Sequence, residues 1–202
     1  MQVEEISESL KQQLLGVKPS RFWAMEYRPC QVKLQNGEII DRVYVAEVDT
    51  YMEIWGVLPD EDTGKKYIVI EEVAEILESP TRMPVALANK LYEAGESGMG
   101  YCLYQMKLDN GQMIDVLSGN AVDFPPIPNG LTTQNIKEVF PHQGSRKNYT
   151  DSPDYTWCLF KGEMPELKNN TGKTATNHGH KAKEAELKNK QGFWSKLKSR
   201  WS

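Results

Sequence analysis

The sequence predicts an α+β fold made mainly of β-strands: two related small antiparallel β units joined by a helix, with a helix before them and a flexible tail after them. Three observations carry this prediction. The chain contains an internal repeat, each copy has an Asn-Gly pair between two apolar runs, and a helical pattern separates the copies. The length of 202 residues suits one sizeable domain or two small ones.

The repeat aligns residues 27–49 with residues 101–123 without a gap, and ten of the 23 aligned pairs are identical. A second match aligns residues 70–73 with residues 136–139, which makes the second copy about eight residues shorter. Similarity along a whole segment indicates a duplicated β unit. The identical pairs are Tyr27/Tyr101, Gln31/Gln105, Lys33/Lys107, Leu34/Leu108, Asn36/Asn110, Gly37/Gly111, Ile40/Ile114, Asp41/Asp115, Val48/Val122 and Asp49/Asp123.

Each copy begins with a predicted hairpin. Residues 32–34 and 106–108 alternate apolar and polar side chains, as a half-buried strand does. Asn36-Gly37 and Asn110-Gly111 follow, and an Asn-Gly pair accepts the positive φ angles of a type I′ turn. We therefore expect each copy to return as a second strand directly after its turn.

Further short strands are expected in the first copy over residues 52–58, 67–70 and 73–77, and together they suit a small barrel or a strongly bent sheet. Three prolines within residues 124–128 exclude a central strand from the second copy, because proline has no donor for the ladder. Residues 148–161 predict a short strand or a strap that docks on the body.

Two helices are predicted. Apolar residues at helical spacing mark about residues 2–15 and residues 84–94, and the second of these helices joins the two β units. Pro84 suits a first turn, and Gly95 suits the position just after a last turn. The resulting division of the chain is residues 1–83, residues 84–162 and residues 163–202.

Charge is divided unevenly along the chain, although the formal net charge is only −4. Residues 1–142 hold 12 Lys and Arg against 22 Asp and Glu, whereas residues 143–202 hold 12 against 6. An acidic body repels nucleic acid, so nucleic acid is not an expected partner. Residues 164–191 have almost no apolar side chains, which predicts a flexible basic linker.

The C-terminal residues 192–201 predict an amphipathic helix with an aromatic face and a basic face. This pattern is typical of helices that dock on a protein or lie on a membrane surface. The docking partner is the protein's own body, a second copy of the chain or another protein; peripheral membrane contact and no fixed partner are the alternatives. The apolar face consists of Phe193, Trp194, Leu197 and Trp201.

Residues 34–40 and 49–54 carry a resemblance to a known family. The first segment resembles the Sm1 hairpin of Sm-like (LSm/Hfq-type) barrels, and the second resembles the Asp-x-x-Met loop motif of that family. The resemblance covers residues 21–79 and implies an Sm-like barrel that binds RNA. Glu53 stands where the family has a base-contacting Asn, and Glu71-Glu72 stands where it has Arg-Gly, so RNA binding is weakened.

Residues 84–144 resemble a family of uncharacterised bacterial proteins. The segments that carry this resemblance are residues 91–101, 119–124 and 139–142. The resemblance implies a bacterial protein and brings no activity with it.

A glycine-rich loop between the second helix and the second unit is the most suggestive short motif. It follows a helix C-terminus, so it lacks the amide donors that a phosphate cradle takes from a helix N-terminus. We expect a structural hinge or a partner-contact loop, with a ligand loop and a catalytic Ser97 as alternatives. The loop consists of Gly95, Glu96, Ser97, Gly98, Met99 and Gly100.

Candidate acid–base chemistry is sparse. A catalytic triad would need Ser97, His142 and either Asp123 or Asp115. The aspartates repeated in both copies could bind a cation or act as acid and base, but hydrogen bonds to turns and strand ends are the expected role. The cysteines have no metal-ligand spacing, and His178 and His180 lie in the tail, so no metal and no cofactor are expected.

The chain shows no secretory signal and no apolar run long enough for a bilayer, so we expect the cytoplasm. The leading hypothesis is a non-catalytic protein-interaction or scaffold protein, and an enzyme is less expected. An Sm-like nucleic-acid-binding protein and a hydrolase centred on Ser97 are the two alternatives.

Overall fold

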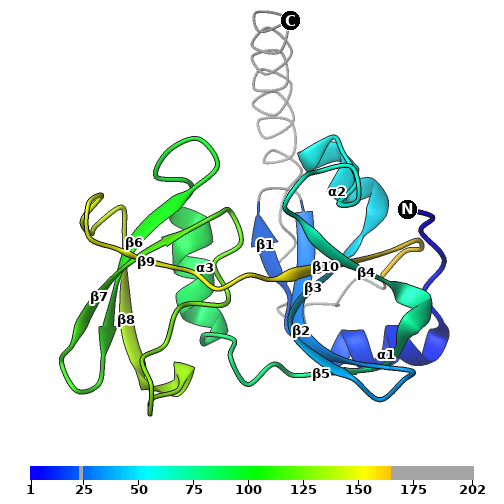
Figure 1. Ribbon diagram of the computed structural model, residues 1–202, viewed down its shortest axis with the longest axis horizontal. Coiled ribbons are helices and arrows are strands. Elements are labelled where there is room, and N and C mark those ends of the chain that lie inside the picture. The colour runs from blue at the N-terminus through cyan, green and yellow to red at the C-terminus, as the bar shows by residue number, and fades with distance from the viewer. Residues whose placement is uncertain (23–24, 165–202) are drawn as a thin grey trace, which may run out of the picture. The chain divides into compact units, whose positions relative to one another are not determined.

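The computed structural model describes residues 1–22 and 25–164 (Figure 1). In this part of the chain the fold is α+β and mainly β, with two sheets and three α-helices. Neither of these sheets closes into a barrel. The barrel, one of the two expected forms, is therefore not formed by these residues, and both sheets stay open. No helix within the same residues is long and apolar enough to cross a membrane.

The first sheet is centred on β2, which is antiparallel to β1, β3 and β5. β10 then lies between β3 and β4 and is parallel to both. The predicted strands over residues 67–70 and 73–77 are confirmed by β4 and β5. The bounds are β1 (Ser20–Phe22), β2 (Met25–Leu34), β3 (Ile39–Glu47), β4 (Lys66–Val69), β5 (Val73–Leu77) and β10 (Thr156–Phe160).

The second sheet has the order β8-β6-β7-β9. β6 is antiparallel to β7 and β8, whereas β9 is parallel to β7. The sheet therefore repeats the order β5-β2-β3-β10 of the first sheet, with the same strand directions. The bounds are β6 (Cys102–Leu108), β7 (Met113–Ser118), β8 (Ile136–Pro141) and β9 (Thr150–Asp151).

The two Asn-Gly hairpins are confirmed and have matching hydrogen bonds. The predicted type I′ turn is wrong, because only the glycine of each Asn-Gly pair has a positive φ angle. The side chain of Asn36 accepts from the backbone N–H of Glu38 at 2.8 Å, and Asn110 accepts from the N–H two residues later at 2.9 Å. Gly37 and Gly111 have φ angles of 88° and 86°, which only glycine adopts without strain. The same residue pattern thus makes the same turn twice.

The third strand of each unit corrects the second part of the sequence alignment. Val73 pairs with Leu34, and Ile136 pairs with Leu108, so residue 73 corresponds to residue 136 rather than to residue 70. The 3₁₀ helix η1 (Ile70–Glu72) precedes β5, as η2 (Thr133–Asn135) precedes β8. The prediction was wrong by three residues because residues 70–73 and 136–139 share a sequence pattern but not a backbone position.

The predicted strand over residues 52–58 is wrong, because this segment belongs mainly to the helix α2 (Val48–Trp55). The Glu47 carboxylate caps the helix by accepting from the backbone N–H groups of Asp49 and Thr50. Gly56 ends it in the left-handed conformation, with φ at 70°. A glutamate cap four residues before a buried tyrosine is a weaker start signal than Ser or Asp, which is why sequence reasoning missed the helix.

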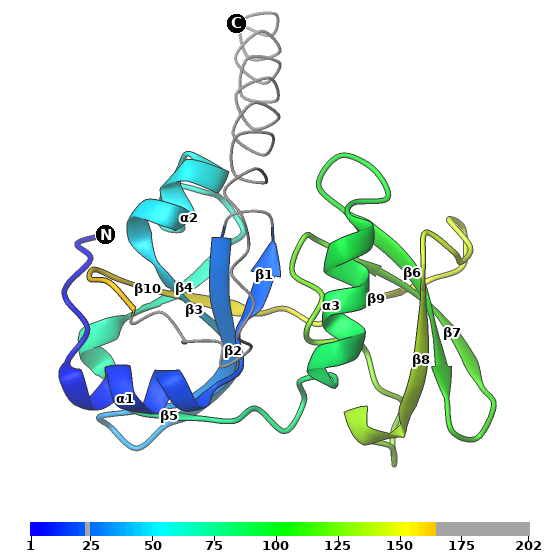
Figure 2. The ribbon, with the colours of Figure 1, turned by 180° about the vertical axis from the view of Figure 1, so that it is seen from behind.

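The other two helices lie where they were predicted, with one change of length. α1 (Glu8–Gly16) begins only after the N-cap Ser7, and before it Glu5 pairs with Lys161 in a parallel bridge. α3 (Val85–Ala94) follows Pro84 and ends at Gly95, as expected. Figure 2 shows α1 alongside β5 and α3 next to β8 and β1.

Residues 150–160 form the strap that the sequence predicted. β9 pairs with β7 of the second sheet, and a few residues later β10 inserts between β3 and β4 of the first. Residues 1–164 form one compact unit, and its larger core cluster contains Tyr44 and Trp157 together with Val122 and Phe124. The predicted C-terminal helix, including Phe193, Trp194, Leu197 and Trp201, lies outside the described residues.

Candidate functional site

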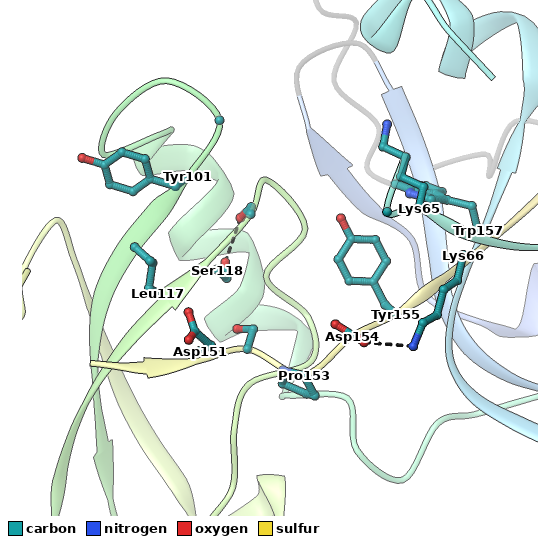
Figure 3. Close-up of a pocket in the computed structure, with 14 residues that line it drawn as sticks. Lys65, Lys66, Tyr101, Leu117, Ser118, Asp151, Pro153, Asp154, Tyr155 and Trp157 are labelled. Carbon is teal, nitrogen blue, oxygen red and sulfur yellow. Dashed lines mark hydrogen bonds and ion pairs between the residues drawn. The ribbon is translucent and has the colours of Figure 1, made fainter. Parts of the chain in front are cut away.

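A cavity of about 350 Å³ lies where the strap passes between the two sheets (Figure 3). This volume is at the lower end of about 300–1,000 Å³ for small-ligand sites. Four separate segments line it. They contribute Gly64, Lys65 and Lys66; Gly100 and Tyr101; Leu117, Ser118 and Gly119; and Asp151, Ser152, Pro153, Asp154, Tyr155 and Trp157.

The two lysines of the cavity already have anionic partners. The Lys65 ammonium lies 2.8 Å from Asp62 and 3.0 Å from the Tyr51 hydroxyl, and 4.5 Å from the centre of a Trp55 ring. Lys66 pairs with Asp154 at 2.9 Å, with both side chains largely exposed. An exposed pair of this kind contributes about 0–1 kcal/mol, so Lys66 remains adaptable whereas Lys65 is held in place.

Several polar side chains of the cavity lack partners among the described residues, including the buried Ser152 hydroxyl and Trp157 indole N–H as well as Asp151 and Tyr155. Among the described residues, no hydrogen bond or ion pair involves the Asp151 carboxylate or the Tyr155 hydroxyl. The Tyr155 ring packs edge-on against Tyr44 and Trp157, with centroids 4.9 Å and 5.9 Å away. Burial raises the pKa of Tyr155 to about 12, so its hydroxyl keeps its proton at neutral pH.

The predicted binding loop, Gly95–Gly100, borders this cavity through Gly100. The carboxylate of Glu96 accepts from the Gly100 N–H at 3.1 Å, and a Cβ on Gly98 would lie 2.4 Å from the Tyr101 ring. The glycines therefore serve the loop's own shape. Met99 stands at the tip with 74% of its surface exposed.

The structure brings Ser97 and His142 together. The Ser97 hydroxyl lies 2.9 Å from His142 Nδ1, and His142 Nε2 lies 3.0 Å from the carbonyl oxygen of Ala94. Because that carbonyl can only accept, Nε2 donates to it. The Ser97 hydroxyl also lies 3.1 Å from the carbonyl oxygen of Leu103, to which it can donate. His142 has a φ of 59°, which is uncommon for a residue with a side chain.

Asp123 does not complete a triad with them. It is fully buried, and its carboxylate accepts from the hydroxyls of Ser20 and Tyr92 at 2.6 Å each. Arg82 donates to the same carboxylate at 3.3 Å. The other triad candidate, Asp115, accepts from the Gln105 side chain at 2.8 Å and the backbone of Ser145 at 2.9 Å. The second ring nitrogen of the histidine thus meets a backbone carbonyl and no carboxylate.

Comparisons with known proteins add no relative. No family model matches the chain. No curated protein and no solved structure matches it either. The function is therefore argued from the cavity, the loop and the surface of this chain.

The repeated aspartates have architectural surroundings. Asp41 accepts from Ser79 and Thr81 at 2.6 Å and 2.5 Å, just after β5. Asp49 lies exposed in the first turn of α2, whereas its counterpart Asp123 is buried. Sequence reasoning matched these last two residues but gave no sign of the partners of Asp123, because they come from distant segments.

Within the described residues no group of three or more His, Cys, Asp or Glu side chains could hold a metal ion. Cys30, Cys102 and Cys158 are buried free thiols. Burial raises the pKa of Cys102 to about 11 and that of Cys158 to about 12, so both remain protonated thiols at neutral pH.

Proposed function

We propose that this protein is a non-catalytic protein-interaction or scaffold protein of the cytoplasm. The observation that carries the proposal is the exposure of Met99 at the tip of a loop that its own hydrogen bonds hold in shape. A large apolar side chain with 74% exposure at the tip of an ordered loop, next to a cavity, supports a role for Met99 as a contact residue.

Preorganisation supports this reading. Ser97 donates its backbone N–H to Tyr101 at 2.9 Å and accepts from the N–H of Leu103 through its hydroxyl at 2.9 Å. A loop that is already ordered loses less entropy when a partner binds. Methionine adapts to irregular surfaces, which suits a contact residue at such a tip.

A pull-down from a lysate of the source organism tests the proposal, with Met99→Asp compared with Met113→Asp. Met113 is the matched control, because it is an exposed methionine at the start of β7, 42% exposed and outside the cavity. We expect Met99→Asp to lose a partner that wild type and Met113→Asp retain. Capture of the same proteins by all three forms would contradict the proposal.

The C-terminal residues enter the proposal as a second contact surface. Their aromatic and basic pattern supports docking on a protein, with a second copy of the chain or a membrane surface as alternatives. The test is a pull-down and a vesicle-sedimentation assay with and without residues 192–202. Unchanged partners and unchanged sedimentation would remove these residues from the proposal.

A hydrolase centred on Ser97 is the second candidate, favoured by the 2.9 Å contact between Ser97 and His142. In such a reaction His142 Nδ1 would take the serine proton. The test is labelling with a fluorophosphonate probe together with an ester and phosphoester panel. Activity that is lost in Ser97→Ala would support the hydrolase, whereas equal results for wild type and Ser97→Ala would end it.

A further inference from the structure

We propose that the cavity beside the strap receives the side chain of an arginine from a partner polypeptide. The inference rests on the proposed function, because it names the chemistry that the partner presents. It is carried by three properties of the cavity. These are the unpaired carboxylate of Asp151, the aromatic ring of Tyr155, which we call the aromatic wall, and the glycines along part of the rim.

The charges of the cavity favour a cation. Lys65 and Lys66 are paired with Asp62 and Asp154, which leaves the carboxylate of Asp151 as the unpaired charge among the described residues that line the cavity. The whole unit also favours positive partners, since residues 1–164 hold 15 Lys and Arg against 25 Asp and Glu. A carboxylate-bearing ligand would meet repulsion from Asp151 and would have to compete with Asp62 and Asp154 for the two ammonium groups.

The aromatic wall favours a guanidinium over an ammonium. Figure 3 places the Tyr155 ring between the lysine segment and the Ser118 segment, with its hydroxyl pointing upward in the view. A planar guanidinium stacks on an aromatic face and can donate in the same plane to a carboxylate, whereas an ammonium is a point charge. Tyr155 and Asp151 line the same cavity and supply these two contacts.

Glycines open the rim to a partner's backbone. A Cβ on Gly64 or Gly100 would point into open space, and one on Gly119 would lie 3.9 Å from the Tyr155 hydroxyl. A partner chain can therefore pass close to the rim while one of its side chains enters. The volume of about 350 Å³ suits a single side chain better than a bulky ligand.

The experiment titrates the full-length protein with N-acetylarginine amide and, separately, with N-acetylcitrulline amide, which has the same shape without the charge. Binding is followed by ¹H–¹⁵N chemical shifts of residues 64–66, 117–119, 151–152 and 154–157. The variants are Asp151→Asn and the control Glu38→Gln, which changes an exposed acid on the first hairpin outside the cavity.

We expect the arginine compound to shift these residues and to bind about tenfold more tightly than the citrulline compound. Asp151→Asn should abolish this preference, and Glu38→Gln should retain it. Equal binding of both compounds, a preference that survives in Asp151→Asn, or shifts confined to other surfaces would each overturn the proposal. Loss of the arginine site with retained Met99-dependent capture would refute this inference alone and leave the proposed function standing.

Discussion

Arg82 and Asp123 form an ion pair inside the protein, with Arg82 Nε 3.3 Å from the carboxylate and the two side chains 4% and 0% exposed. Ser20 and Tyr92 donate to the same carboxylate. These residues come from β1, from the connection between β5 and α3, from α3 itself and from the segment after β7. One buried carboxylate therefore fixes the second β unit, its helix and an edge of the first sheet to each other.

Replacing Arg82 by Met should destabilise the protein strongly. The change leaves the Asp123 carboxylate buried without its cation, which costs about 3–5 kcal/mol of the free energy of unfolding. Urea unfolding measures the loss. Arg21→Met is the matched control, because Arg21 pairs with Glu26 at the surface with 67% of its side chain exposed, and this loss should stay below about 1 kcal/mol. Equal losses in the two variants would contradict the importance of the buried pair.

The titration of Asp123 should appear in the pH dependence of stability. Burial raises the pKa of Asp123 above its ordinary 3.8, while Arg82 and the two hydroxyl donors act in the opposite direction. The folded protein then holds the proton more tightly than the unfolded chain does. This contribution to stability is complete below pH 3.8 and is lost as the pH rises through the raised pKa.

Asp123→Asn removes this titration. We therefore expect its free energy of unfolding to decline less than that of wild type as the pH rises from 3.8. Urea unfolding between about pH 3 and about pH 7 gives the two curves. Parallel curves would show that Asp123 titrates alike in the folded and unfolded states.

The two Asn-Gly turns should respond alike to the same substitution. Gly37→Ala and Gly111→Ala each force a side chain into positive φ, at a cost of about 1–2 kcal/mol. Gly16→Ala is the control, because Gly16 ends α1 without a positive φ and with free space around its Cβ position. Thermal unfolding compares the three variants, and a loss confined to one turn would argue against equivalent hairpins.

The repeat shows how far sequence reasoning reaches in this chain. The alignment of residues 27–49 with residues 101–123 was enough to predict both hairpins, because an Asn-Gly turn and its flanking strands are encoded within about a dozen residues. The third strands were misaligned by three residues, since residues 70–73 are similar to residues 136–139 but residues 70–72 form a 3₁₀ helix and the strand begins only at Val73. Local patterns thus fix a turn better than they fix register across a long insertion.

The candidate site was only partly accessible from sequence. The loop could be found from its glycines. Ser97 and His142 could be named as triad candidates because few other groups of that chemistry exist in the body, and the structure places them 2.9 Å apart without either candidate aspartate. The cavity could not be found, since four segments between residues 64 and 157 build it and tertiary packing brings them together. The side chains that donate to the Asp123 carboxylate could not be predicted for the same reason.

A final prediction concerns the contact between Gly98 and Tyr101. A Cβ on Gly98 would lie 2.4–2.5 Å from the Cε1, Cζ and hydroxyl atoms of the tyrosine, so Gly98→Ala must displace the ring or the loop. The substitution should destabilise the wild-type protein but cost little when Tyr101→Ala has already removed the ring. Such non-additivity is the signature of two residues in direct contact.

A double-mutant cycle followed by urea unfolding and by the ¹H–¹⁵N signal of Met99 measures this coupling. Displacement of the ring should also shift the Met99 signal, because Met99 lies between the two residues in a loop closed by the Ser97 to Tyr101 hydrogen bond at 2.9 Å. If the loop is the contact surface proposed above, Gly98→Ala should weaken partner capture and the double variant should not restore it, since the Tyr101 ring would still be missing. Strictly additive losses of stability would mean that Tyr101 does not pack on Gly98, and the rigidity assigned to this loop would then have no structural basis.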